Sequence, residues 1–266
     1  MMQLYDLDHC VQKSSGSTAA IRPMSDQKEP LILAIETATR AGSYALCRGA
    51  QVLAAVSGNA AESHSTSLLE RVNSILQQGG ATIRELELLA VAKGPGSFTG
   101  LRIGLATVKA LAVFAGKRVI GVSTLAAIAH AAGNSDATLS LLPAGRGEVF
   151  AQLFSVSDGL VREHDQAAHL SPQALTEKYK HVTKLLLAGE GACLHAELLS
   201  KTVGKDSRIV DPREHLAIDV AALALNYYRA GQSQNPEDLR ALYVRPSDAE
   251  IKERWQQEQA AQSRQA

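Results

Sequence analysis

A glycine-dense turn between an apolar strand and an apolar helix constrains the fold of this chain more than any other feature. Residues 93–100 read KGPGSFTG, between the apolar runs 88–92 and 101–115. Glycine tolerates positive φ and close backbone approach, a Ser or Thr can cap the following helix, and the free N–H groups at a helix start attract anions. The turn therefore predicts an anion- or nucleotide-binding region with five candidate residues: Gly94, Gly96, Ser97, Thr99 and Arg102.

The glycine spacing excludes two common nucleotide motifs. It reads G-x-G-x-x-x-G, which differs from the dinucleotide fingerprint, and no Gly-Lys-Ser/Thr ending makes it a Walker A loop. The alternative is a structural turn, in which Gly94 and Gly96 only satisfy backbone geometry and Thr99 only caps the helix. The residue types leave both interpretations open.

Apolar periodicity predicts an α/β protein with two lobes. Segments 31–36, 43–48 and 51–57 read as strands joined by turns, and residues 68–76 follow as an amphipathic helix. The runs on either side of the glycine turn, with a strand at 118–122, complete a β-α-β unit. A second lobe is expected from strands near 139–143, 148–156 and 184–189, helices near 171–179 and 192–200, and a terminal helix 216–229.

These segments divide the chain into four parts. We expect a polar extension at 1–29, a first lobe at 30–134 that carries the glycine turn, a second lobe with the terminal helix at 135–250, and a polar tail at 251–266. Helix 101–115 is apolar nearly all round and must be buried on most sides. Its cover is either its own domain or another protein.

Composition limits the possible functions. Lys plus Arg and Asp plus Glu both number 27, so no global positive field recruits nucleic acid, although a local basic patch stays possible. The three cysteines are widely spaced, and the eight histidines contain no i, i+4 pair, so we predict neither disulfides nor a metal site. No apolar run reaches the ~20 residues of a membrane span and no secretory leader is visible, which favours a cytoplasmic protein without membrane association.

Several motifs, in order along the chain, resemble the TsaB (YeaZ) family. They are LILAIETAT at 31–39, His64-Ser65 with Leu68-Leu69, GPGSFTGLRIG at 94–104, ATVKALA at 106–112, GVSTL at 121–125, RGEVF at 146–150 and YVRPSDAE at 243–250. The resemblance spans about residues 31 to 250. It implies the two-lobed fold of actin, sugar kinases and Hsp70, and a part in forming threonylcarbamoyladenosine on tRNA.

The resemblance also implies partners. In this family the chain is a non-catalytic partner of TsaD, which transfers the threonylcarbamoyl group from its adenylate to tRNA adenosine. An ATPase, TsaE, joins the assembly, tRNA is reached through the complex, and the free chain forms a homodimer. ATP or ADP would lie at a subunit junction, with no cofactor bound by this chain alone. The helices 68–76 and 101–115 would form the partner interface, with candidates Leu68, Leu69, Val72, Leu101, Leu105 and Val108.

Departures from catalytic relatives support a non-catalytic role and leave no catalytic residue to name. Ala38 stands where they place Gly in the first phosphate loop, and its Cβ would obstruct a phosphate. Thr124 and Ile128 align with the two metal-binding histidines of TsaD. Pro143 and Gly145 replace the usual Asp and Arg of the family.

The alternative function is that of an independent enzyme, either a phosphotransferase of the same fold or a peptidase. A peptidase would need a nucleophile and its base, but Ser63 beside His64 is typical of a helix start.

Overall fold

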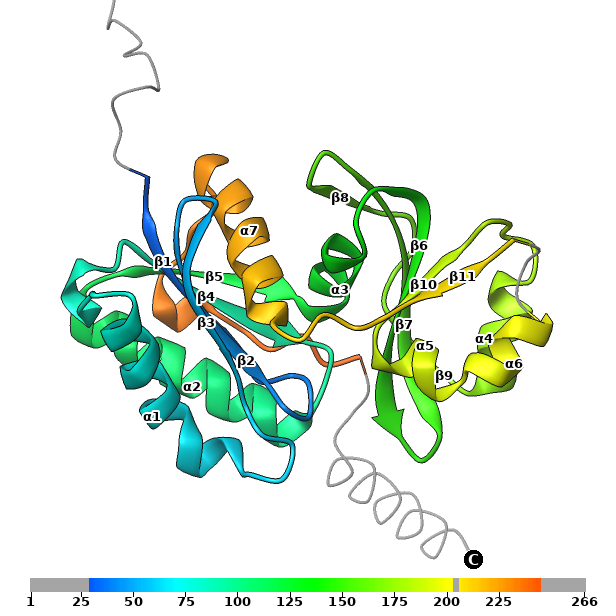
Figure 1. The fold of residues 1–266 in the computed structure, drawn as a ribbon, viewed down its shortest axis with the longest axis horizontal. Coiled ribbons are helices and arrows are strands. Elements are labelled where there is room, and N and C mark those ends of the chain that lie inside the picture. The colour runs from blue at the N-terminus through cyan, green and yellow to red at the C-terminus, as the bar shows by residue number, and fades with distance from the viewer. Residues whose placement is uncertain (1–28, 203–205, 245–266) are drawn as a thin grey trace, which may run out of the picture.

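The first sheet explains why the chain begins with three closely spaced apolar strands. In the computed structural model, which describes residues 29–202 and 206–244, β1 (Leu31–Glu36), β2 (Ser43–Arg48) and β3 (Gln51–Ser57) are antiparallel. Strands β4 (Leu88–Gly94) and β5 (Arg118–Ser123) extend the sheet parallel to β1, in the order β3-β2-β1-β4-β5. Nearly every residue of β1 and β4 is buried, as expected for strands covered on both faces (Figure 1).

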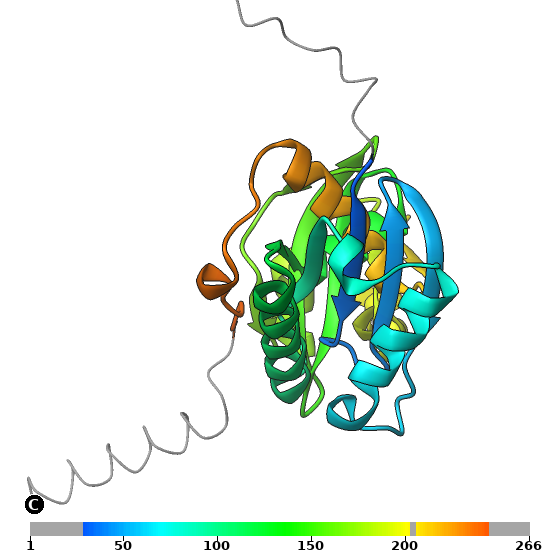
Figure 2. The same cartoon turned by 90° about the vertical axis from the view of Figure 1, so that its left-hand side faces the viewer.

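Helices cover both faces of this sheet. On one face lie α1 (His64–Gln78), against β2 and β3, and α2 (Phe98–Ala115), against β4. The opposite face is covered by α7 (Leu216–Arg229), which contacts β1, β2, β4 and β5 (Figures 1 and 2). We expected this terminal helix to belong with the second lobe, and that assignment was wrong. The chain returns to the first lobe because the apolar face of α7 completes the first core.

The second lobe is built on a mixed sheet with a long hairpin at its centre. Strands β6 (Ser135–Gly145) and β7 (Glu148–Ser157) form the hairpin, in the sheet order β11-β10-β6-β7-β8 with β9 paired to β7. The remaining elements are β8 (Leu160–Glu163), β9 (Ala168–Leu170), α4 (Pro172–Tyr179), β10 (Leu186–Ala188), α5 (Glu190–Leu194), α6 (Ala196–Thr202) and β11 (Arg208–Val210). The expected extension before residue 29 and the tail 251–266 lie outside the described residues.

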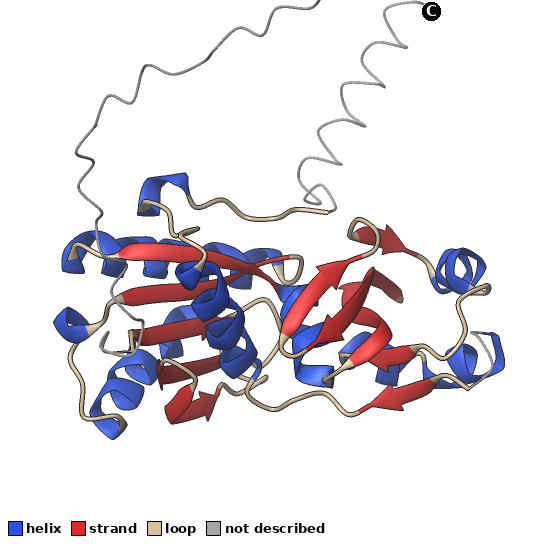
Figure 3. Ribbon diagram, turned by 90° about the horizontal axis from the view of Figure 1, so that it is seen from above, coloured by secondary structure: helices blue, strands red, loops and turns tan. Residues whose placement is uncertain are grey.

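Helix α3 (Thr124–Ala132) joins the lobes (Figure 3). It contacts β6, β7 and β8 of the second lobe and packs against α7 of the first. At this contact His130 Nδ1 lies 2.7 Å from Oδ1 of buried Asp219 on α7, and Arg213 Nε lies 3.4 Å from the other carboxylate oxygen. The seam between the lobes therefore holds a paired buried charge.

Helix α2 is long and apolar enough, by length and composition alone, to cross a membrane, a property found in no other helix of the described segments. In the fold it is a surface-layer helix: Leu101, Leu105 and Val108 are buried against the first sheet, whereas Val113 and Phe114 are exposed. Packing on the sheet explains the apolar inner face of α2, but only 33% of the helix is buried, so packing within this chain does not explain Val113 and Phe114.

Replacing Leu223 on α7 tests the assignment of this helix to the first core. The side chain is buried, so Leu223→Ala should lower the free energy of unfolding by about 2–5 kcal/mol through lost burial and a cavity. Exposed Leu160 provides the control, and Leu160→Ala should cost less than about 0.5 kcal/mol. Urea unfolding measures both, and equal effects would contradict the packing of α7 described above.

Candidate functional site

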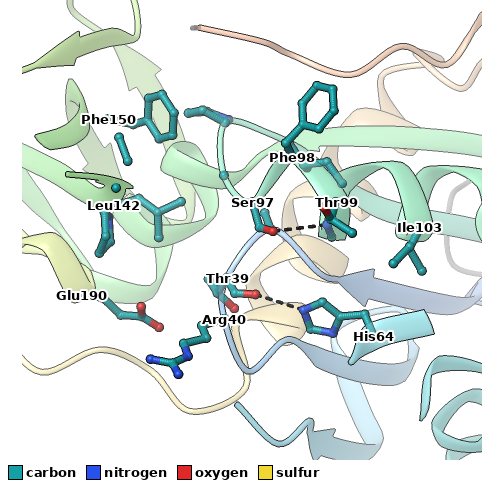
Figure 4. Close-up of a pocket in the computed structure, with 18 of the residues that line it drawn as sticks. Thr39, Arg40, His64, Ser97, Phe98, Thr99, Ile103, Leu142, Phe150 and Glu190 are labelled. Atoms are coloured by element: carbon teal, nitrogen blue, oxygen red, sulfur yellow. Dashed lines mark hydrogen bonds between the residues drawn. The ribbon is translucent and has the colours of Figure 1, made fainter. Parts of the chain in front are cut away.

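A cleft of about 960 Å³ lies between the two lobes. From the first lobe it is lined by the β1–β2 loop at 38–40 and the glycine turn at 95–101. From the second lobe come the end of β6 at 142–145, Phe150 and Glu190 (Figure 4). Residues 242–244, at the end of the C-terminal segment 232–244, close one side of the cleft. The predicted glycine turn therefore does face a cleft.

Most glycines of the turn serve contacts within the chain. A Cβ on Gly100 or Gly104 would overlap Thr37, and one on Gly96 would overlap Ala38. The close approach is held by two hydrogen bonds of 2.8 Å: Thr37 Oγ1 donates to the Gly100 carbonyl, and the Ser97 N–H donates to the Ala38 carbonyl. These glycines let the start of α2 lie directly on the β1–β2 loop, which is the structural interpretation of the motif.

Gly94 has a separate reason to be glycine. Its φ is +114°, a conformation that other residues rarely adopt, and a Cβ there would meet the Leu242 carbonyl at 2.5 Å. The Leu242 N–H donates to the Lys93 carbonyl at 2.7 Å. Gly94 thus lets the C-terminal segment pass across the turn.

The polar candidates separate into two groups. Ser97 caps α2 by accepting the Gly100 N–H at 3.2 Å, and both Ser97 and Thr99 are exposed in the cleft. Arg102 does not line the cleft: its guanidinium lies 3.9 Å from the Phe98 ring centroid, and its Nε donates to the Tyr243 hydroxyl at 3.4 Å. The five candidates therefore do not converge on one point.

Sequence reasoning missed three charged residues of the cleft, Arg40, Glu62 and Glu190. Two of them come from opposite lobes. Arg40 reaches in from the β1–β2 loop and Glu190 from the start of α5 in the other lobe (Figure 4). Neither stands in a recognisable motif, because only the arrangement of the two lobes brings these loops together.

Glu36 is almost fully buried where β1 ends. Its carboxylate accepts the Thr39 N–H and hydroxyl, both at 2.7 Å, and the Ser43 hydroxyl at 3.5 Å. Burial raises the pKa of this carboxyl, although the Thr39 hydrogen bonds oppose the shift. Its hydrogen-bond partners Thr39 and Ser43 are neutral and lie in the β1–β2 region, so the side chain stabilises this loop.

The helix start at Ser63 and His64 is structural too. Ser63 Oγ accepts the Ser65 N–H at 3.3 Å as an N-cap, and His64 Nε2 lies 3.3 Å from the Thr39 carbonyl. The imidazole and the neighbouring hydroxyl thus have separate partners. This arrangement matches a cap and a loop contact, and it gives no nucleophile–base pair.

Five of the six predicted partner-interface residues are in the core. Leu68, Val72, Leu101, Leu105 and Val108 are at most 7% exposed, because they form the faces of α1 and α2 that pack on the sheet. Assigning them to a partner surface was wrong. Leu69 is 65% exposed, and Val113 and Phe114, which sequence reasoning missed, are each 69% exposed. Val113 and Phe114 follow Ala110 by three and four residues and Ala106 by seven and eight, which places all four on one side of α2. This helical spacing was the signal in the sequence that could have identified the exposed side.

The described residues contain no group of three or more His, Cys, Asp or Glu side chains that could hold a metal. Thr124 and Ile128, where α3 begins, are buried apart from any such cluster.

Two mixed sheets that face each other across a cleft, joined by α3 and α7, define a two-lobed protein of the actin, sugar-kinase and Hsp70 class, as the sequence predicted. Residues 56–239 match the family described as TsaD, tRNA N6-adenosine threonylcarbamoyltransferase. The chain is 30% identical to the TsaB protein of Escherichia coli, over 80% of this chain and 94% of that protein. It is 29% identical to TsaB of Bacillus subtilis, over 83% and 96%.

A solved structure agrees with these relatives. YeaZ from Pseudomonas aeruginosa aligns with a TM-score of 0.68 at 24% identity, covering 80% of this chain and 99% of that chain. The chain belongs to the TsaB family, the tRNA threonylcarbamoyladenosine biosynthesis proteins.

Gly104→Ala tests the close contact between α2 and the β1–β2 loop. In an ordinary helix this change stabilises by up to about 1 kcal/mol. Here the new Cβ would overlap Thr37 Oγ1, so we expect destabilisation of about 1–3 kcal/mol. In a Thr37→Ala background the cost of Gly104→Ala should fall, and additive effects in this double-mutant cycle would contradict the contact.

Glu36→Gln tests the buried carboxyl. Because the pKa of Glu36 is raised in the folded state, the folded chain binds this proton more tightly than the unfolded chain does. The protonated carboxyl therefore favours folding at low pH, and this contribution is lost as the pH rises above the ordinary pKa of 4.5. The free energy of unfolding of the wild type should therefore fall relative to Glu36→Gln between pH 4.5 and pH 7.5. Urea unfolding across this range measures the difference, with exposed Glu70→Gln as a control that should follow the wild type.

Proposed function

We propose that this chain is the non-catalytic partner of a TsaD-like transferase in the formation of N6-threonylcarbamoyladenosine on tRNA. The partner would transfer the threonylcarbamoyl group from its adenylate to the tRNA adenosine. Membership of the TsaB family supports a part in this tRNA modification. The exposed apolar side chains of α1 and α2 and the residues of the cleft support the role of a non-catalytic partner.

The observation that carries the proposal is exposed apolar surface on two adjacent helices. Leu69 of α1 and Val113 and Phe114 of α2 are each at least 65% exposed, and α1 and α2 contact each other. Ala106 and Ala110 lie beside them on the exposed side of α2 and allow close approach of another helix. Exposed apolar side chains on neighbouring helices are typical of a protein interface.

The cleft supports a role in positioning rather than in chemistry. Thr37, Ala38 and the Leu242 carbonyl occupy the space beside the glycines of the motif, so little of this backbone is free to bind a phosphate. Ser97, Thr99 and Arg40 remain accessible as groups that could touch a nucleotide. We therefore place ATP or ADP at a junction with another subunit, where the partner supplies the missing ligands.

Further assembly follows from the same surface. We propose that α1 and α2 pair with a second copy when the chain is alone and with the TsaD-like protein in the complex, since one apolar patch can serve only one occupant at a time. A TsaE-like ATPase would join the complex, tRNA would be reached through it, and the assembly would work in the cytoplasm.

The decisive experiment is size-exclusion chromatography with light scattering of the chain mixed with the TsaD-like protein from the same organism. We expect a one-to-one complex that Val113→Asp with Phe114→Asp weakens at least tenfold, because two charges would be buried at the interface. Leu194→Asp, at a 63% exposed position in the second lobe, should leave the complex intact.

Circular dichroism should show that every variant stays folded. The absence of any complex with the wild type would contradict the proposal. A purified chain that by itself hydrolyses ATP or cleaves peptides, with the activity lost on a single substitution in the cleft, would also contradict it and favour an independent enzyme.

A further inference from the structure

Charge is unevenly distributed along this neutral chain. Between Glu87 and Asp136 the sequence holds five Lys or Arg residues and no Asp or Glu. The five are Lys93, Arg102, Lys109, Lys117 and Arg118, on or beside β4, α2 and β5. The protein thus has a local excess of positive charge on one part of the first lobe, which its net charge conceals.

These cations lack compensating acids. Within residues 29–202 and 206–244, none of the five forms an ion pair. Arg102 contacts a ring and a hydroxyl, and Arg118 donates to the Asn235 side chain and to the Ser233 carbonyl, all neutral groups. The nearest acids in sequence on the neighbouring segment are Glu237 and Asp238 of η3 (Pro236–Asp238), beside Arg240. The positive charges are therefore available to an external anion.

The C-terminal segment 232–244 runs beside α2 (Figure 2). Arg118 donates to it at Ser233 and Asn235, and Arg102 donates to it at Tyr243, so we define the basic edge as this segment together with the neighbouring side of α2. The segment begins at β5, where Gln234 pairs with Val119, and η3 then contacts α2. It ends at the start of α2, where Tyr243 meets Phe98. An 18-residue helix is ~27 Å long, so the edge is long enough to follow several phosphates.

An aromatic group lies at the cleft end of this edge. The ring centroids of Phe98 and Tyr243 are 5.2 Å apart, and the Arg102 guanidinium lies over the Phe98 ring. The Tyr243 side chain is 46% exposed. Anchoring the segment does not require this exposure, because buried Leu239 and the Leu242–Lys93 hydrogen bond already hold it. An exposed aromatic ring next to arginine is the arrangement on which unstacked bases are bound.

The basic edge adjoins the apolar partner surface on α2. Arg102 and Lys109 are two helical turns apart and lie on the same side of α2, facing the C-terminal segment. At ~100° per residue, Val113 lies about 20° round the helix from Arg102, and Phe114 lies about 120° from it. The two surfaces therefore meet near Val113, and Phe114 lies furthest from the cations.

We propose that this edge binds RNA directly: Arg102 and Lys109 contact phosphates of a single-stranded loop, and an unstacked base lies on Tyr243. The inference rests on the proposed function, which makes tRNA the RNA concerned. It adds that this chain, and not only its partner, holds the substrate.

The test is fluorescence anisotropy of labelled, unmodified tRNA with the assembled complex over a range of salt concentrations. Arg102→Ala with Lys109→Ala should reduce the slope of log K against log salt by about 1.4, the value for two lost single-strand phosphate contacts. Tyr243→Ala should weaken binding about fivefold or more with little change of slope. Tyr243→Phe keeps the ring and should bind like the wild type.

The matched control is Lys180→Ala with Lys201→Ala, which removes the same charge from exposed lysines of the second lobe. It should change neither affinity nor slope. Light scattering on each complex separates this inference from the proposed function: no assembly by the wild type contradicts the function.

Two outcomes overturn the RNA surface alone. One is unchanged tRNA binding by intact complexes that carry Arg102→Ala with Lys109→Ala or Tyr243→Ala. The other is loss of assembly in the charge variant, which would assign this edge to the protein partner.

Discussion

The contact between α2 and the loop after β1 determines the arrangement of the first lobe. Thr37 lies where Gly100 and Gly104 leave no side chain, and its hydroxyl donates to the Gly100 carbonyl at 2.8 Å. Any larger residue on that face of α2 would move the helix away from the sheet. The position of α2 in turn fixes the cleft wall, the exposed apolar side chains and the basic edge, so all three depend on a few missing Cβ atoms.

The second constraint is the seam between the lobes. Helix α7 returns from the second lobe to cover the first sheet, and the Ala217 N–H donates to Ser43 Oγ at 2.9 Å where the helix begins. Asp219 is then buried against His130 and Arg213, from α3 and from the segment before α7. Breaking such a pair leaves a buried charge without a partner. The seam therefore favours one arrangement of the lobes, and the cleft has a defined shape.

Local sequence patterns predicted the strands and helices well, because apolar periodicity reports which face of each element is buried. They could not predict that α7 packs on the first sheet. That packing depends on an uncovered face of a sheet whose first strands lie over 170 residues earlier in the sequence. They also could not separate the two faces of α2. Leu105 and Phe114 are equally apolar, yet one is 7% exposed and the other 69%. Arg40 and Glu190 line the same cleft only because the fold brings two distant loops to it.

The glycine motif shows how a sequence signature can be specific without marking a ligand site. Its residues identify the family, yet Gly94, Gly96, Gly100 and Gly104 are each filled by the chain's own atoms. The same packing turns the rest of α2 outward, where Arg102 and Phe114 lie about 120° apart round the helix with Val113 between them. A helix anchored so firmly on its inner face can present two adjoining outer surfaces in fixed relation. In the role proposed for this chain, that fixed relation would hold a protein partner and an RNA strand in one arrangement.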